Sequence, residues 1–558
     1  MKKFKNILVL ILVAGVGFYS CDGQEGSLVN DRLDDNPLPP GSTPATGTQG
    51  DADFTKYIAI GNSLTAGYMD AALYNDGQES SLGALIAAKM KIAVEADGDT
   101  FDSFDQPDIN SVNGFNTSTQ PPGGTPVLGR FKLDLVAQAP SPVISGEPIG
   151  TFSGNKAALN NFGVPGIQVG QMLTGATGGP QSQANPAFNP FYARMASDPG
   201  SSTIIGDVLA SQPTFFTLWI GSNDILGYAL SGASNEAIFT SEGDFQTRFN
   251  AVMSNLQNNT SAKGVVATIP PVLTIPFFRA IDYDRIELDA TLAGQLNAGL
   301  SSVNGAIQGC ANFGVEQSDI DRRLVSYSVG TNPILVIDEE LDDLETCFDQ
   351  LQVFGQIDAQ QRASLVPYEQ SRPLTEGELV LLSAGSVLNT PFGGDATKPI
   401  GIVIPLGFNT DGSLSGDKFY LTLAEQGAIQ SRSNAFNTTI ATEVATANGG
   451  AANPRFGLFD LNAGLPGNPN TSLGAFADLL GLDGEVGIRI EGRLLSPDFR
   501  PNGIYSTDGV HPNIRGNAIL ANEFIKVIEA TFGSSLPDVE VIPLPSITAC
   551  AGDCASEQ

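Results

Sequence analysis

The sequence predicts an α/β fold in which helices cover both faces of a mainly parallel sheet. Short apolar runs bounded by glycine and proline recur along the chain, and each has the length of a buried strand. The segments between these runs are long enough for helical crossovers, and this alternation of strand and helix is typical of parallel sheets. Five strands are expected, at 54–60, 156–162, 214–220, 264–269 and 456–460.

Helices are expected at 81–90 and 286–307, and a short strand at 418–422 is expected to lead into a helix that ends near residue 446. The clearest helical pattern covers 514–532, where apolar residues recur at steps of three and four and Gly533 is expected to end the helix. This stripe would face the core; it consists of Ile514, Ala518, Ala521, Ile525, Ile528 and Phe532.

Two long segments, 97–150 and 311–417, interrupt the alternation and are expected to be insertions in a globular body that spans 51–533. The aspartates of the first insertion lack the spacing of a calcium loop, so a solvated loop is favoured there. The second insertion is expected to cover the functional site, and together the insertions are expected to decide the substrate. An irregular tail is expected over 534–558.

The composition argues against binding to nucleic acid. With 60 acidic and 28 basic residues, the formal net charge is -32. Such a chain repels the phosphate backbone and anionic membrane surfaces. We therefore predict no nucleic-acid partner, and no protein partner is indicated.

The N-terminus has the layout of an export signal. Lys2, Lys3 and Lys5 precede an uncharged, mostly apolar run at 7–19, which is too short to span a membrane comfortably. The run ends at Ser20–Cys21, where a small residue before cysteine resembles a bacterial lipobox.

We expect a signal peptide at 1–20, lipidation of Cys21 and a flexible tether at 21–50. The protein would then be exported and anchored to the bacterial cell envelope, at the outer membrane, and would contact the membrane only through its lipid. An ordinary signal peptide with an incidental cysteine is the alternative.

The remaining cysteines are Cys310, Cys347, Cys550 and Cys554. An even number in an exported chain suggests disulfides, and four cysteines allow three pairings. Pairing Cys310 with Cys347 is favoured because Cys550 and Cys554 form a local pair. Zinc binding is disfavoured because the chain has a single histidine and no paired Cys-x-x-Cys spacing. No metal or other cofactor is predicted.

A serine follows the first strand, in Gly61-Asn62-Ser63-Leu64. A tight turn at the end of a strand exposes a serine hydroxyl at the edge of the sheet, as a nucleophile requires. The alternative is that Ser63 is simply the N-cap of the next helix.

His511 is the only histidine of the chain, and Asp508 lies three residues before it. Because the carboxyl ends of parallel strands share one edge, these residues can meet Ser63 there. His511 would then take the Ser63 proton while Asp508 orients the imidazole. A structural histidine is the alternative. The backbone N–H groups of Ser63 and Gly163 and the side-chain amide of Asn223 are the candidates for an oxyanion hole.

These four blocks resemble those of the SGNH/GDSL hydrolase family, in the same order. The blocks are Gly61-Asn62-Ser63-Leu64, Gly163, Gly221-Ser222-Asn223-Asp224 and Asp508-Gly509-Val510-His511-Pro512. The resemblance implies a flavodoxin-like three-layer α/β/α fold and metal-independent ester hydrolysis. It also implies Ser63 as nucleophile, His511 as base, Asp508 as orienting residue, and Gly163 and Asn223 as oxyanion donors.

The chain departs from the family pattern at Asn62, where the family has aspartate, and in its much greater length. The first function hypothesis is an envelope esterase or lipase acting through an acyl-enzyme on a small-molecule or lipid ester. A carbohydrate esterase that deacetylates glycans is the second, and a catalytically silent surface-binding lipoprotein is the third. The apolar stretch 270–278 favours binding of an acyl chain, although burial beneath the insertion explains it equally well.

Overall fold

The computed structural model describes residues 46–119, 125–416, 418–462, 487–552 and 554. The predicted signal peptide, Cys21 and the tether up to residue 45 lie outside the described residues. Residues Thr48–Gln558 form one compact unit. No helix in the described ranges is long and apolar enough to cross a membrane.

The centre of this unit is a parallel sheet with the strand order β15-β6-β5-β1-β4. In chain order, this is the 2-1-3-4-5 arrangement of flavodoxin-like sheets. The predicted three-layer α/β/α fold is therefore confirmed. The strands are β1 (Tyr57–Gly61), β4 (Asn161–Gly163), β5 (Phe215–Trp219), β6 (Lys263–Ala267) and β15 (Phe456–Phe459).

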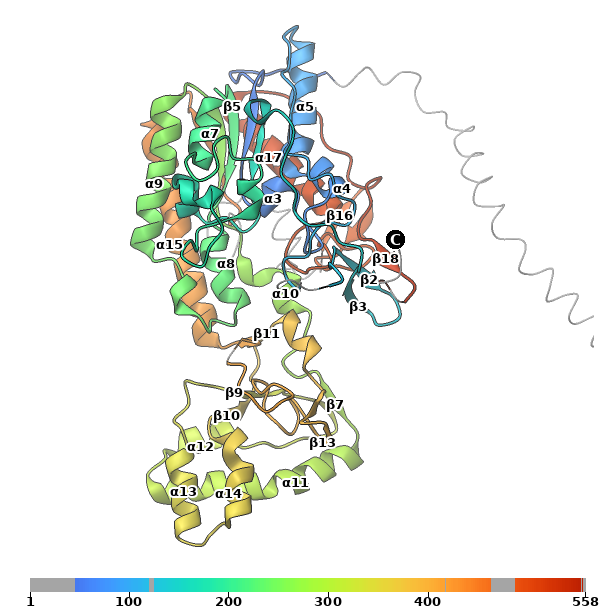
Figure 1. Ribbon diagram of the computed structural model, residues 1–558, viewed down its shortest axis with the longest axis vertical. Coiled ribbons are helices and arrows are strands. Elements are labelled where there is room, and N and C mark those ends of the chain that lie inside the picture. The colour runs from blue at the N-terminus through green and yellow to red at the C-terminus, as the bar shows by residue number, and fades with distance from the viewer. Residues whose placement is uncertain (1–45, 120–124, 417, 463–486, 553, 555–558) are drawn as a thin grey trace, which may run out of the picture. The chain divides into compact units, whose positions relative to one another are not determined.

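Alternation along each strand divides the apolar side chains between the two faces of the sheet. In β1, Ile58 and Ile60 join one core, whereas Tyr57 and Ala59 join the other. Helices α9 (Glu242–Asn259) and α15 (Leu423–Asn448) pack on the first face, and α5 (Leu82–Ala96) and α17 (Ile514–Phe532) pack on the second (Figure 1). The predicted apolar stripe of α17 lies in this second core from Ala518 onward, whereas Ile514 packs against Met69, Ala72 and Tyr74.

Shorter elements complete the layer around the sheet. The helices are α3 (Ser63–Ala66), α4 (Asn75–Glu79), α6 (Pro190–Ala193), α7 (Ile204–Ala210), α8 (Asn223–Leu230) and α10 (Pro276–Arg279). The first insertion contributes β2 (Phe131–Asp134) and β3 (Ala139–Pro142), which form a small sheet with β18 (Ala549–Cys550). A hairpin, β16 (Ile488–Ile490) and β17 (Arg493–Leu495), precedes the loop that carries His511.

The second insertion belongs to a third apolar core, which extends from Ile281 to Tyr420 and so begins before the insertion expected at 311–417. Its helices are α11 (Ala290–Gly309), α12 (Gln317–Arg323), α13 (Glu345–Val353) and α14 (Ala359–Leu365). Its strands pair in twos: β7 (Ile286–Leu288) with β8 (Gly330–Asn332), β9 (Leu335–Ile337) with β10 (Ser371–Pro373), β11 (Leu379–Val380) with β14 (Tyr420–Leu421), and β12 (Pro391–Phe392) with β13 (Asp395–Pro399).

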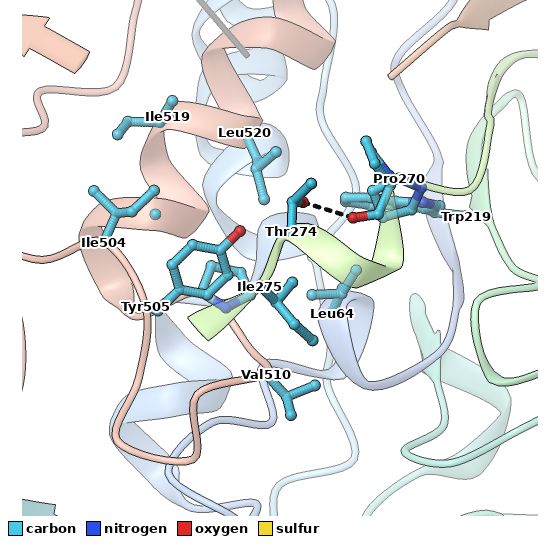
Figure 2. Close-up of a pocket in the computed structure, with 13 residues that line it drawn as sticks. Leu64, Trp219, Pro270, Thr274, Ile275, Ile504, Tyr505, Val510, Ile519 and Leu520 are labelled. Carbon is cyan, nitrogen blue, oxygen red and sulfur yellow. Dashed lines mark hydrogen bonds between the residues drawn. The ribbon is translucent and has the colours of Figure 1, made fainter. Parts of the chain in front are cut away.

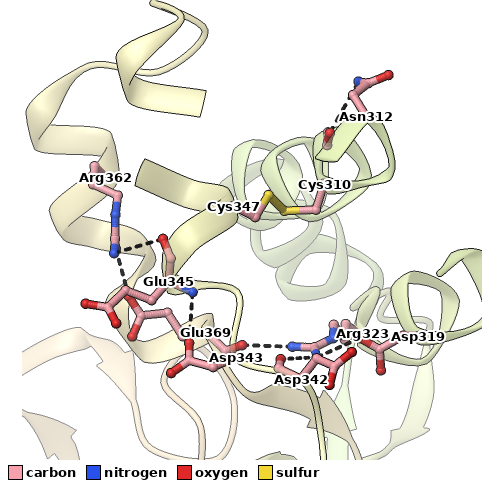
Figure 3. The surroundings of a disulfide bond; sticks show 11 residues. Cys310, Asn312, Asp319, Arg323, Asp342, Asp343, Glu345, Cys347, Arg362 and Glu369 are labelled. Atoms are coloured by element: carbon pink, nitrogen blue, oxygen red, sulfur yellow. Dashed lines mark hydrogen bonds and ion pairs between the residues drawn. A yellow bond between two sulfur atoms is a disulfide. The ribbon is translucent and has the colours of Figure 1, made fainter. Parts of the chain in front are cut away.

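A disulfide and a buried cation hold this third core together (Figure 3). Cys310, directly after α11, is bonded to Cys347 in α13, and Cys550 is bonded to Cys554, so the favoured pairing is confirmed. Arg323 is fully buried; its guanidinium pairs with Asp319 and donates to the backbone oxygens of Asp342 and Glu369. Burial of this charge is tolerated because each of its nitrogens has an acceptor.

Three expected elements differ from the prediction. Residues 156–162 are not one strand: Asn155 caps a short 3₁₀ turn at Lys156–Ala158, and only Asn161–Gly163 joins the sheet. The expected helix at 286–307 begins only at Ala290, because Asp289 caps it by accepting from the Leu292 N–H. The strand expected at 418–422 is reduced to β14, which pairs with β11 instead of the central sheet.

The C-terminal stretch was also expected to be irregular, yet it is tied into the body. β18 pairs in parallel with β2, and Leu536, Val539 and Val541 are buried in the core beneath α5 and α17. The sequence showed only isolated apolar residues there, whose partners lie hundreds of positions away.

Candidate active site

Ser63 lies directly after the carboxyl end of β1, in the first turn of α3, and is 7 % exposed. The N-cap of α3 is Asn62, whose side chain accepts from the Leu64 N–H at 3.1 Å. Capping is therefore carried out by Asn62, and the alternative reading of Ser63 as the N-cap is wrong. Gly61 is required before the turn, since a Cβ there would lie 2.5 Å from the Trp219 carbonyl oxygen.

The structure brings His511 and Asp508 to Ser63 in one chain of hydrogen bonds. His511 Nε2 lies 2.9 Å from Ser63 Oγ, and His511 Nδ1 lies 2.8 Å from Asp508 Oδ2. A carboxylate can only accept, so Nδ1 carries the proton in the neutral imidazole and Nε2 accepts from the Ser63 hydroxyl. The arrangement suits general-base activation of a serine.

The Asp508 carboxylate is buried but satisfied by four donors. Oδ1 accepts from the backbone N–H groups of Val510 and His511, and Oδ2 accepts from the Ala71 N–H and from His511 Nδ1. Burial alone would raise the pKa of Asp508, but the neighbouring His511 and these hydrogen bonds outweigh it and lower the pKa to about 2. Asp508 is therefore ionised near neutral pH.

The three candidate oxyanion donors differ in what they already bind. Asn223, the first residue of α8, is half-buried, and its side-chain amide donates to the Ile167 carbonyl at 2.9 Å, which fixes its orientation. The Gly163 N–H donates to Asn161 Oδ1 at 2.8 Å and would have to share or release that bond. The Ser63 N–H makes no hydrogen bond within the described residues.

Gly163 is nevertheless fixed by packing. Its Cα faces α3 so closely that a Cβ would lie 2.3 Å from the Ala66 nitrogen. Any side chain here would displace the turn that carries Ser63.

Two supporting residues were not recognised as such from the sequence. Asp224 is fully buried and accepts from the Val169 N–H and the Thr240 hydroxyl, both at 3.0 Å, which ties the segment after β4 to the start of α8. Burial raises the pKa of Asp224 to about 6. The ring of Tyr68 packs against His511, with 5.0 Å between ring centroids. The motif Gly221-Ser222-Asn223-Asp224 contained the first of these residues, but nothing in the sequence indicated the second.

The structure also contains an apolar pocket (Figure 2). Its wall includes Leu64 and Val510, the neighbours of Ser63 and His511 in sequence. The empty space inside it is about 540 Å³, which includes the part open to solvent. The other lining residues are Trp219, Pro270, Pro271, Thr274, Ile275, Ile504, Tyr505, Pro512, Gly516, Ile519 and Leu520.

Within the described ranges, one group of side chains has a spacing that could hold a metal ion, namely Asp134 with Cys550 and Cys554. The two cysteines are bonded to each other and so offer no thiolate ligand.

Comparison with known proteins yields one match. The family model described as GDSL-like Lipase/Acylhydrolase matches residues 57–338, about half of the chain. The matched range contains Ser63, Gly163 and Asn223 and ends before Asp508 and His511. Neither the curated proteins nor the solved structures gave a match.

If Asn223 donates to a developing oxyanion, Asn223→Ala will lower kcat for a simple aryl ester by about 10²- to 10³-fold, with a smaller change in KM. Ser222→Ala is the matched control, because the Ser222 hydroxyl is buried in the same turn and has no hydrogen-bond partner among the residues that the structure describes. Steady-state kinetics of the two variants would test the role, and equal rates would contradict it.

Proposed function

Since the chain belongs to the GDSL-like Lipase/Acylhydrolase family and is a hydrolase of ester bonds, we propose that it cleaves carboxylic esters through an acyl-enzyme on Ser63. The observation that carries this proposal is the unbroken series of contacts from Ser63 Oγ through His511 to the buried Asp508 carboxylate. An inactive surface-binding protein would have no need of this arrangement.

The proposed reaction has two halves. Ser63 Oγ attacks the ester carbonyl carbon while His511 Nε2 takes the hydroxyl proton, and the oxyanion is held by Asn223 and the Ser63 N–H. Collapse of this intermediate breaks the ester C–O bond, and His511 returns the proton to the leaving alcohol. Water, deprotonated by His511, then attacks the acyl-enzyme and releases the acid and free Ser63. Asp508 stabilises the imidazolium formed in each half.

The apolar pocket favours an acyl chain as the part of the substrate that is recognised. Its walls consist mainly of aliphatic and aromatic side chains, and they include Leu64 and Val510, the chain neighbours of the proposed nucleophile and base. Such walls stabilise methylene groups by removing them from water, whereas a glycan acetyl group would leave most of this surface unused. We therefore propose that esters with longer acyl chains, including lipid esters, are better substrates than acetylated glycans. Deacetylation of glycans remains the second candidate.

We further propose that the enzyme is exported and anchored to the cell envelope, at the outer membrane, through a lipid on Cys21. The support is the sequence at 1–21: a basic start, a short apolar run and a small residue before cysteine. A single acyl chain binds membranes only marginally, so stable anchoring needs more than one chain on the N-terminal cysteine.

Replacement of Ser63 by alanine will lower kcat for a short-chain aryl ester by about 10⁶-fold, because nucleophile and base act as a unit. A fluorophosphonate probe will label the unaltered protein at Ser63, as located by mass spectrometry of the peptides. Turnover retained by the folded Ser63→Ala variant, or label on a different residue, would refute the proposed mechanism.

If the pocket binds the acyl chain, kcat/KM will rise from acetyl to hexanoyl esters by up to about fourfold per methylene, the value expected for buried CH₂ groups. Thr274 is half-buried in the pocket wall, so a larger side chain at this position would block the pocket. Thr274→Phe will lower kcat/KM for the hexanoyl ester by about tenfold, the loss expected when two methylenes stay in water, and leave the acetyl ester within about twofold.

Thr274→Val is the matched control, since it keeps the shape of the side chain and removes only the hydroxyl that donates to the Pro271 carbonyl. It is expected to preserve the chain-length series. A flat series in the unaltered enzyme, together with preference for acetylated xylan or pectin, would select the glycan esterase instead.

Lipidation predicts that the full-length chain, expressed in a Gram-negative host, incorporates radiolabelled palmitate and sediments with membranes. Cys21→Ser will abolish both, because the thiol is the attachment point. Ser27→Ala, in the same segment, is the control and is expected to behave like the unaltered chain. Label that persists in Cys21→Ser would exclude Cys21 as the lipid site.

A further inference from the structure

The turn Met69–Ala72 has an unusual backbone conformation close to the proposed active site. Asp70 (φ 55°) and Ala71 (φ 61°) are the only consecutive non-glycine residues with positive φ in the described part of the chain. Met69 and Ala72 exchange backbone hydrogen bonds of 3.2 and 3.0 Å around them, which makes this a tight two-residue turn. Left-handed backbone is unfavourable for alanine and persists only where surrounding contacts enforce it.

The backbone of this turn faces the segment that carries Asp508. The Ala71 N–H donates to Asp508 Oδ2 at 3.0 Å, the same oxygen that accepts from His511 Nδ1. The Asp70 N–H donates to the Ser506 hydroxyl at 3.1 Å. The left-handed conformation thus directs the successive N–H groups of Asp70 and Ala71 at Ser506 and Asp508.

The Asp70 side chain binds the same segment through its carboxylate. Its Oδ1 accepts from the Thr507 N–H at 2.9 Å and from the Thr507 hydroxyl at 2.6 Å, and its Oδ2 accepts from the Tyr74 hydroxyl at 2.7 Å. Asp70 is 4 % exposed and Thr507 is fully buried. Burial raises the pKa of Asp70, while the hydrogen bonds from Thr507 and Tyr74 oppose that effect and the nearby Asp508 adds to it. Arg130 lies over the Tyr74 ring, 4.4 Å from its centre.

We propose that Asp70 is a positioning residue, which holds Ser506–Asp508 so that the Asp508 carboxylate reaches both His511 and the Ala71 N–H. Asp70 acts only through Asp508 and contacts neither the Ser63 hydroxyl nor the imidazole. This inference rests on the proposed function of Ser63, His511 and Asp508, and it adds a residue that no family block contains.

The variants that test the proposal remove one or both carboxylate oxygens of Asp70. Asp70→Ala removes every acceptor and is expected to lower kcat for a small aryl ester by about 10²- to 10⁴-fold, where the upper limit is loss of the orienting carboxylate itself. KM is expected to change less than about threefold. Asp70→Asn keeps an oxygen for Thr507 and is expected to retain kcat within about tenfold. Tyr74→Phe, which removes only the outer bond, is the matched control and is expected to behave like Asp70→Asn.

A spectroscopic readout separates positioning from general damage. His511 is the only histidine, so protein labelled with ¹⁵N-histidine reports on this one imidazole. In the unaltered enzyme, the Nδ1 proton is expected to resonate far downfield because it is held by Asp508; in Asp70→Ala that signal is lost. The acid limb of the kcat/KM profile is also expected to move to lower pH, since a displaced carboxylate no longer stabilises the imidazolium.

An Asp70→Ala variant that is folded and keeps both its kcat and the downfield signal would overturn the proposal. If that variant does not fold, Thr507→Val takes its place, because it removes one hydroxyl with little change of shape. A loss of about tenfold in kcat together with a shifted acid limb would support the proposal. An unchanged kcat and an unchanged pH profile would overturn it. Absence of any ester hydrolysis by the unaltered enzyme would refute the proposed function, while the NMR signal would still decide whether Asp70 positions Asp508.

Discussion

The hydrogen bond between Ser63 Oγ and His511 Nε2 joins residues 448 positions apart, and the fold is what makes this contact possible. A parallel sheet places the carboxyl ends of all its strands at one edge, so a turn after β1 and a loop before α17 can face each other there. The 2-1-3-4-5 order puts β1 between β4 and β5, which carry Gly163 and Asn223 at their ends. Ser63, Gly163 and Asn223 thus follow three neighbouring strands, and the loop before α17 brings Asp508 and His511 to the same edge.

The electrostatic demand at this edge is the burial of a negative charge in a chain whose formal net charge is -32. An unpaired carboxylate would be costly there, yet Asp508 has four donors, three of them backbone N–H groups that cannot rotate away. Two of these N–H groups belong to the Asp508–His511 loop itself, and the third comes from Ala71. The loop therefore carries Asp508 and His511 of the proposed reaction. The left-handed turn at Asp70 and Ala71 contributes one of the donors that keep Asp508 ionised.

The strand-and-helix pattern predicted the sheet and the place of Ser63 and Asn223 after buried strands, because the apolar runs before them can be read directly. His511 and Asp508 were singled out because the chain has one histidine and an aspartate three residues before it. Asp70 could not be found in this way, since its role depends on a positive φ that sequence shows only for glycine and on contacts with Thr507, 437 positions away. The same limit applies to β14 and β18, whose partners are distant strands. The Gly163 N–H was a candidate oxyanion donor, but its local bond to Asn161 was not visible in the pattern.

The two insertions were expected to decide the substrate, yet the apolar pocket argues that other segments bind it. All thirteen lining residues come from the turn after β1, the end of β5, the segment after β6, and the His511 loop with α17. None comes from 97–150 or 311–417. The insertion around α11 and α13 has a separate core with its own disulfide, and Leu382 lies near the backbone of Gly509, where a Cβ would meet it at 3.1 Å. Acyl-chain preference would then reside in the same elements as the reaction, and the insertion would act on the site through the loop that carries Asp508 and His511.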